Sequence, residues 1–219
     1  MSKFPLSYSR VSCFKKCPAQ FEFMYVDKSV VDHGSDATRY GERVHKSLER
    51  YGETGDEAEL TKETKKWKLL VDKLLAYDGN KYFEYKMAIT ESLEPCDWMA
   101  EDVWFRGIAD VLIVNGDKAY CLDWKTGKSR YEDVNQLKIF AAMVMFHFPE
   151  VNVVRADFFW LVEDRHTKVV FDRIHLKTLW GRMEEQFNAV QEAVDLGVFV
   201  AKPSRLCNWC AAKEICIYK

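Results

Sequence analysis

Apolar and polar side chains alternate in several stretches of the chain, and a period of two is typical of β-strands. Residues 103–128 contain two such stretches, separated by residues 115–117, Asn-Gly-Asp, which supply the positive-φ residues of a tight hairpin turn. Residues 81–90 form a further alternating stretch before this hairpin, and residues 153–162 and 168–174 form a second hairpin after it. The pattern predicts a central sheet built from these strands.

Apolar residues recur at three- to four-residue spacing in the remaining segments, which predicts amphipathic helices. Five segments show this period: residues 6–26, 36–51, 61–77, 131–148 and 176–196. Ser7 or Ser9 is the expected cap of the first helix, and Pro18 is expected to break it or to open a second short helix. Gly52 is expected to end the second helix.

The composition indicates a folded protein without a large electrostatic field. The chain has 219 residues with 48% hydrophobic and 14% aromatic content, enough to bury one core, so residues 1–219 are expected to form a single domain. The net charge is -2, so a nucleic-acid surface must come from local basic clustering. We find no apolar run of membrane-spanning length and no signal-peptide core, which predicts a cytoplasmic protein that does not contact a membrane.

Seven cysteines in a reducing compartment argue against a disulfide framework and favour metal or cluster ligation. Cys207, Cys210 and Cys216 have the spacing of such a site, but clusters and structural zinc sites usually take four ligands. The fourth ligand must therefore come from elsewhere in the chain. Cys96 and Cys121 are expected to be packed as small apolar residues.

The first hairpin carries two acids and a lysine at one end. Four residues of its first strand are expected to share one face: Ile108, Asp110, Leu112 and Val114. The turn then brings Asp110 and Asp123 to the same edge of neighbouring strands, with Lys125 on the face of Asp123. Two carboxylates can hold a divalent cation while the lysine positions water, as metal-assisted phosphodiester hydrolysis requires. For either acid alone, a solvated surface hairpin is the alternative.

Two sequences in this hairpin resemble the nuclease core of the PD-(D/E)XK superfamily, specifically the RecB-like exonucleases. They are Gly-Ile-Ala-Asp, which ends at Asp110, and Cys-Leu-Asp-Trp-Lys-Thr-Gly at residues 121–127. The resemblance implies that Asp110 is the first acid of the motif and that Asp123 and Lys125 are the second acid and its lysine.

Other positions extend the resemblance along the chain. Gly41-x-x-x-His45 matches the pattern in which the histidine completes the cation site, although a lone helical histidine is otherwise an ordinary helix residue. Glu84 resembles an additional acidic position of the family. Gln136 also fits, but Phe140 stands where the family has tyrosine, so any contact made by that hydroxyl is lost.

The resemblance implies a cation held by side chains and one backbone carbonyl: His45, Asp110, Asp123 and the carbonyl of Trp124. The ion would be Mn²⁺ or Mg²⁺, and imidazole beside carboxylates tilts the choice toward Mn²⁺. Lys125 would position water and stabilise the transition-state charge. Glu84 would hold a second ion or orient water, and Gln136 would orient the DNA through its amide.

The first residues of the chain resemble the N-terminal signature of RecB-like nucleases that carry an iron-sulfur cluster. The matching sequences are Ser-Tyr-Ser-Arg, which ends at Arg10, and Cys17-Pro18-x-x-Phe21. Cys17 would then join Cys207, Cys210 and Cys216 around a 4Fe-4S cluster, with residues 1–30 and 200–219 forming a clasp. Cys13 is the alternative fourth ligand, and zinc is the alternative occupant. Arg10 would contact DNA phosphate.

Taken together, the sequence predicts an α/β nuclease with a mixed central sheet flanked by helices. The resemblance implies metal-dependent cleavage of DNA from an end, with single-stranded DNA and 5'-to-3' polarity favoured. Its setting would be recombination, repair, phage DNA processing or CRISPR adaptation in a bacterial, archaeal or phage-infected cell, as a homo-oligomer or with a recombination or CRISPR protein. A structure-specific endonuclease and a non-catalytic DNA-binding subunit with a degenerate nuclease fold are the alternatives.

Overall fold

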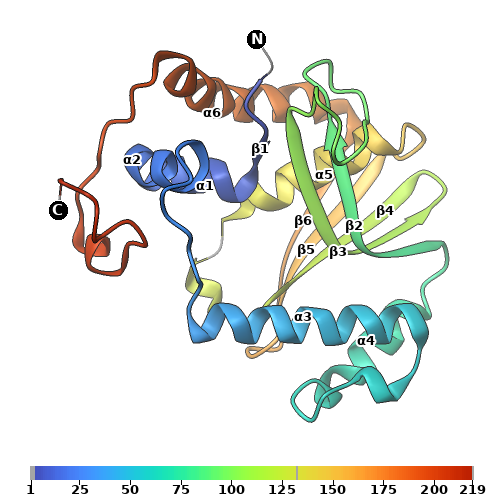
Figure 1. Cartoon of the computed structure of the whole chain (residues 1–219). Coiled ribbons are helices and arrows are strands. Elements are labelled where there is room, and N and C mark those ends of the chain that lie inside the picture. The colour runs from blue at the N-terminus through green and yellow to red at the C-terminus, as the bar shows by residue number, and fades with distance from the viewer. Residues whose placement is uncertain (1–2, 132, 219) are drawn as a thin grey trace.

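A mixed six-stranded sheet lies at the centre of the chain in the computed structural model, which describes residues 3–131 and 133–218 (Figure 1). The strands are β1 (Leu6–Ser7), β2 (Asn80–Ile89), β3 (Phe105–Asn115), β4 (Lys118–Lys125), β5 (Val153–Trp160) and β6 (Arg165–Asp172). Neighbouring strands follow the order β1-β3-β4-β5-β6, and β2 pairs with β3. The predicted α/β fold with a mixed central sheet is thus confirmed.

Strand pairing leaves part of β3 open on one side. β2 pairs antiparallel with β3 over nearly its whole length, so β1 and β4 must share the other side. There β1 runs parallel to the start of β3 at Phe105 and Arg106, whereas β4 pairs antiparallel with β3 from Val111 onward. Within the described chain, residues 107–110 therefore have no strand on that side.

Helices cover both faces of the sheet (Figure 1). α3 (Asp36–Thr54) and α4 (Lys68–Leu75) pack on one face, where their core includes Leu48, Val111 and Trp124. α5 (Val134–His147) and α6 (Leu176–Leu196) pack on the other face, together with α1 (Tyr8–Lys16) and α2 (Pro18–Phe21). A π-helical turn follows α2 at Glu22–Val26, and short 3₁₀ turns occupy Glu57–Glu59, Lys65–Trp67, Ser129–Tyr131, Arg173–His175 and Arg205–Trp209.

The helix predicted for residues 36–51 continues past Gly52, so the prediction that this glycine ends it is wrong. A Cβ atom at position 52 would lie 2.1 Å from the ring of Phe83, so glycine lets that ring of β2 pack against α3. The helix ends at Gly55 instead, which adopts a left-handed conformation with φ of 69°.

Two other predicted helices differ from the structure. Ser7 caps α1 and Pro18 opens α2, as expected, but the strand β1 at the start of this segment was not predicted. The predicted helix at residues 61–77 is α-helical only in α4, because the hydroxyl groups of Thr61 and Thr64 compete for the backbone before it.

The C-terminal segment leaves α6 and runs down one side of the molecule, beside the first helices (Figure 1). The backbone N–H of Lys202 donates to Sγ of Cys17 at 3.4 Å, and its Nζ donates to the carbonyl of Lys15 at 3.1 Å. The ranges predicted from the sequence include residues 1, 2, 132 and 219, which lie outside the described residues. Among the described helices, none has both the length and the apolar character that a membrane-spanning helix requires.

Candidate active site

The two predicted acids lie where β3 and β4 separate. The last pair of this ladder is Val111 with Leu122, so Asp110 and Asp123 are the next residues on the two diverging strands. The backbone N–H of Trp124 donates to Oδ2 of Asp110 at 2.6 Å. This hydrogen bond links the strands after their ladder has ended and fixes the Asp110 carboxylate at the fork.

Along β3, side chains alternate between the two faces of the sheet, and this alternation shifts by one residue at Asp110. Ala109 packs with the α5 core, whereas Val111 packs with the α3 core, although odd positions of a regular strand share one face. The shift coincides with Glu84 on β2, which has a positive φ of 47°. Leu112 stays in the α5 core, so the prediction that Asp110 shares its face is wrong.

We expect Glu84→Gly to stabilise the metal-free protein, because a non-glycine residue in the left-handed region costs of order 1–3 kcal/mol. The substitution also removes a carboxylate from beside Asp110. Recovery of about 1 kcal/mol would raise the melting temperature by about 2–4 °C, measured by differential scanning calorimetry without metal. Glu84→Gln is the control, because it removes the charge and keeps the backbone restriction. A glycine variant that melts below the glutamine variant would contradict the backbone explanation.

His45 reaches the acids from α3. Its Nδ1 lies 3.3 Å from Oδ2 of Asp110. A Cβ atom at Gly41 would lie 3.1 Å from Oγ1 of Thr126, so glycine one turn before His45 allows α3 to approach the end of β4. One ligand atom from each of His45, Glu84 and Asp110 lies within 4.8 Å of the others.

The crowding of acids shifts proton affinities in this group. Burial raises the pKa of Glu84 to about 7, and the charge of Asp110 adds to this effect. Burial alone would lower the pKa of His45, but its hydrogen bond with Asp110 and the charges of Asp110, Asp123 and Glu84 raise it to about 9. The group therefore favours added positive charge, and its carboxylate and imidazole donors fit Mn²⁺ or Mg²⁺.

Asp123 forms a second group with Lys125 and Gln136. Nζ of Lys125 lies 2.7 Å from Oδ2 of Asp123 and donates to Oε1 of Gln136 at 3.1 Å. Nε2 of Gln136 donates to Oδ1 of Asp123 at 3.0 Å. Burial raises the pKa of Asp123 to about 6, while Lys125 opposes the rise. Oδ2 of Asp123 is buried and forms an ion pair with Lys125 without a well-aligned hydrogen bond, so this oxygen can still coordinate a cation.

The structure therefore brings the predicted residues together as two neighbouring groups. Glu84 lies with His45 and Asp110, and Asp123 lies outside this group of three. Gln136 contacts Asp123 and Lys125, so orientation of DNA by its amide stays a prediction. Trp124 contacts Asp110 through its backbone N–H, and coordination of a cation by its carbonyl likewise stays a prediction.

Arg10 lies among aromatic rings near this site. Its Nη1 donates to the carbonyl of Pro5, and its Cζ lies 5.4 Å from the ring centroids of both Phe4 and Tyr25. These contacts hold the N-terminal segment together. Contact of Arg10 with DNA phosphate stays a prediction.

Tyr8 and Asp133 are two residues of the site region to which the sequence analysis assigned no role. The hydroxyl of Tyr8 donates to Oδ2 of Asp133 at 2.7 Å, which ties α1 to the start of α5 close to Gln136. Burial raises the pKa of Tyr8, and the hydrogen bond with Asp133 raises it further. The hydroxyl of Tyr8 therefore keeps its proton and remains a donor. The sequence feature that could have identified Asp133 is its position as a helix cap three residues before Gln136.

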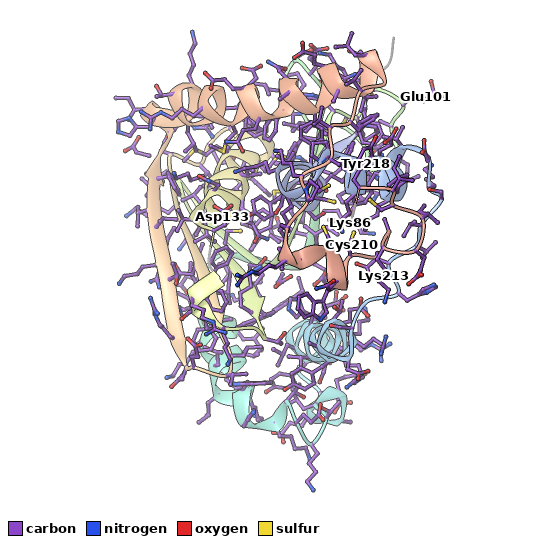
Figure 2. All side chains as sticks on the ribbon, turned by 90° about the vertical axis from the view of Figure 1, so that its left-hand side faces the viewer. Lys86, Glu101, Asp133, Cys210, Lys213 and Tyr218 are labelled. Atoms are coloured by element: carbon purple, nitrogen blue, oxygen red, sulfur yellow. The ribbon has the colours of Figure 1, made fainter. Side chains whose placement is uncertain are left out.

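The four cysteines predicted to form one site line a common cavity of about 220 Å³: Cys17, Cys207, Cys210 and Cys216. Figure 2 shows Cys210 on the C-terminal segment, which passes the first helices. None of the described cysteines forms a disulfide. Burial raises the pKa of Cys210, and the charges of the other three cysteines add to the rise. In the described part of the chain, no three cysteine sulfur atoms lie within 4.8 Å of one another.

Comparisons with known proteins show the family of this chain. The family model described as the PD-(D/E)XK nuclease superfamily matches residues 5–217. A solved structure described as a "Putative exonuclease" from Eubacterium rectale is 13% identical, with a TM-score of 0.56, and the match covers 99% of this chain and 90% of that one. The structure of SSO0001 is 16% identical, with a TM-score of 0.44, and the match covers 100% and 88%. No curated protein sequence matches the chain.

Proposed function

The chain belongs to the PD-(D/E)XK nuclease superfamily, and on this premise we propose that it is a divalent-metal-dependent deoxyribonuclease that hydrolyses DNA from its ends. The observation that carries the proposal is the convergence of Asp110, Asp123 and Lys125 where β3 and β4 separate. A surface hairpin with solvated charges would not bury both acids beside a helical histidine.

The candidate cation ligands come from four elements that meet at this fork. They are His45 on α3, Glu84 on β2, Asp110 on β3, and Asp123 with the carbonyl of Trp124 on β4. When bound, Mn²⁺ or Mg²⁺ supplies Lewis acidity at the scissile phosphate and lowers the pKa of water. The protein's own contribution is to hold these donors in a crowded, half-buried group.

Lys125 is the proposed source of positive charge for the transition state. Its Nζ lies between Asp123 and Gln136, so the ammonium group is fixed in place before substrate arrives. From there it can donate to the attacking water or to a phosphate oxygen that gains negative charge. Gln136 keeps both Asp123 and Lys125 in this position and acts as a positioning residue.

The proposed substrate is single-stranded DNA degraded with 5'-to-3' polarity, as the family resemblance implies. The test is degradation of end-labelled single-stranded, double-stranded and circular single-stranded DNA in Mn²⁺. We expect the linear single strand to be consumed and the circle to stay intact. Cleavage of the circle would show an endonuclease, and binding without cleavage of any substrate would show a non-catalytic subunit.

His45→Ala should raise the Mn²⁺ concentration needed for half-maximal cleavage by about tenfold or more, because one neutral ligand is lost while the carboxylates still attract the ion. The measurement is a Mn²⁺ titration of cleavage rate at saturating DNA. His175→Ala is the matched control, since His175 is exposed beside α6. An unchanged titration for His45→Ala would make His45 an ordinary helix residue.

A 4Fe-4S cluster is the proposed occupant of the cysteine cavity. Four thiolates around one zinc at about 2.3 Å would lie roughly 3.8 Å apart. Among the described residues, no three cysteine sulfur atoms lie within 4.8 Å of one another, so the four thiols do not have the spacing of such a zinc site, and they line one cavity of about 220 Å³. The donor set of four thiols therefore fits a cluster better than zinc. Its proposed role is structural, as a link between α1 and the C-terminal segment.

A further inference from the structure

A cluster of two basic side chains and one aromatic ring lies beside the acids. It comprises Lys86 on β2, Arg106 on β3 and Trp98 in the segment between these strands. Cζ of Arg106 lies 5.4 Å from the Trp98 ring centroid, and Nζ of Lys86 lies 5.8 Å from it. Lys86 is paired with Ile108, so the cluster adjoins the part of β3 that β4 leaves open.

The guanidinium of Arg106 has unused hydrogen-bonding capacity. Its Nε is buried and has no hydrogen-bond partner in residues 3–131 or 133–218. None of the described acids forms an ion pair with it, and Arg10 is close enough that the charge of Arg106 adds to the effect of burial in lowering the pKa of Arg10. A buried donor without a partner is costly, so this arrangement favours an incoming anion.

Two cavities connect this cluster to the acids. A cavity of about 370 Å³ is lined by Arg106, Trp98 and Asp123, and one of about 720 Å³ is lined by Lys86 and Asp110. Ile108 lines both cavities, so they adjoin at the open side of β3. A DNA strand that runs from one cavity to the other would pass Asp123 and Asp110.

We propose that Arg106 and Lys86 bind a phosphate of the substrate strand that neighbours the scissile phosphate. Arginine forms short, charge-assisted hydrogen bonds with phosphate oxygens, and these would satisfy its buried Nε. Trp98 keeps the guanidinium oriented by lying against it. This inference rests on the proposed function and adds to it a defined contact that holds the strand in place over the acids.

The test is a scan of one DNA strand in which each phosphate in turn is replaced by a neutral methylphosphonate. Affinity is measured by fluorescence anisotropy in Ca²⁺ without Mn²⁺ or Mg²⁺, and a gel confirms that the strand stays intact. We expect one linkage near the cleaved end to weaken wild-type binding about tenfold. Arg106→Gln should bind the unmodified strand about tenfold more weakly and should be insensitive to that linkage.

Salt dependence gives an independent readout. Loss of one phosphate contact should reduce the slope of log affinity against log salt by about 0.7 for single-stranded DNA. Arg182→Gln on the exposed side of α6 is the matched control and should behave as wild type. Lys86 is exposed, so Lys86→Gln is expected to fold. If Arg106→Gln does not fold, Lys86→Gln should show the same weaker binding and the same insensitivity to that linkage.

Failure of this inference differs from failure of the proposed function. An active wild-type enzyme whose Arg106→Gln variant keeps the same sensitive linkage and salt slope would overturn the phosphate contact alone. If Arg106→Gln does not fold, a Lys86→Gln variant that keeps the same sensitive linkage and salt slope would likewise overturn the phosphate contact alone. A wild-type protein that neither binds nor cleaves single-stranded DNA would overturn the proposed function and this inference with it.

Discussion

Replacement of Asp110, Asp123 or Lys125 by alanine is expected to reduce DNA cleavage by about a thousandfold or more while DNA affinity stays close to wild type. In the proposed mechanism the two acids hold the cation and Lys125 stabilises the transition-state charge. Loss of one group that stabilises the transition state costs about 10²–10³ in rate, and residues that act as a unit cost more. Affinity comes mostly from phosphate contacts elsewhere along the strand. The measurements are single-turnover cleavage of labelled single-stranded DNA in Mn²⁺ and anisotropy in Ca²⁺.

Asp117→Ala provides the matched control, because Asp117 is an exposed acid in the turn of the same hairpin. Melting temperatures identify any variant that fails through unfolding. Asp123→Asn is a further check, since asparagine keeps the shape of Asp123 and can still accept the hydrogen bond from Gln136. Near wild-type turnover in any one of the three alanine variants would remove that residue from the mechanism.

The sequence was sufficient to predict that Asp110 and Asp123 meet, because hairpin geometry fixes which residues lie opposite each other. It could not predict the change of face at Asp110. That change coincides with Glu84 in a left-handed conformation, and glutamate carries no local signal for positive φ. Without the shift, a regular strand would place Asp110 with Leu112 in the α5 core and away from His45.

Features that depend on distant packing were also beyond a reading of local pattern. β1 has two residues and exists only through its pairing with the start of β3. Gly52 resembles a helix terminator in sequence, and only the ring of Phe83 shows why glycine is needed there. The clustering of Arg106 with Trp98 likewise required the path of the segment that joins β2 to β3.

Substitution of Cys17, Cys207, Cys210 or Cys216 by alanine is expected to lower solubility and to reduce the melting temperature by roughly 10 °C before it alters the chemistry. A cofactor held only by the folded chain adds its binding free energy to folding. Here it would link α1 to the C-terminal segment, which otherwise reaches α1 through contacts such as those of Lys202. The measurements are calorimetry and cleavage at low temperature.

Wild-type protein purified without oxygen should be brown and should contain iron and sulfide in comparable amounts. Cys96→Ser is the control, because Cys96 lies in the segment before β3, far in sequence from the cysteine cavity. Cys13→Ser tests the alternative fourth ligand and should keep the iron, since Cys17 lines the cavity with the three C-terminal cysteines and Cys13 does not. A colourless, fully active preparation with stoichiometric zinc would overturn the cluster and leave a four-cysteine zinc site.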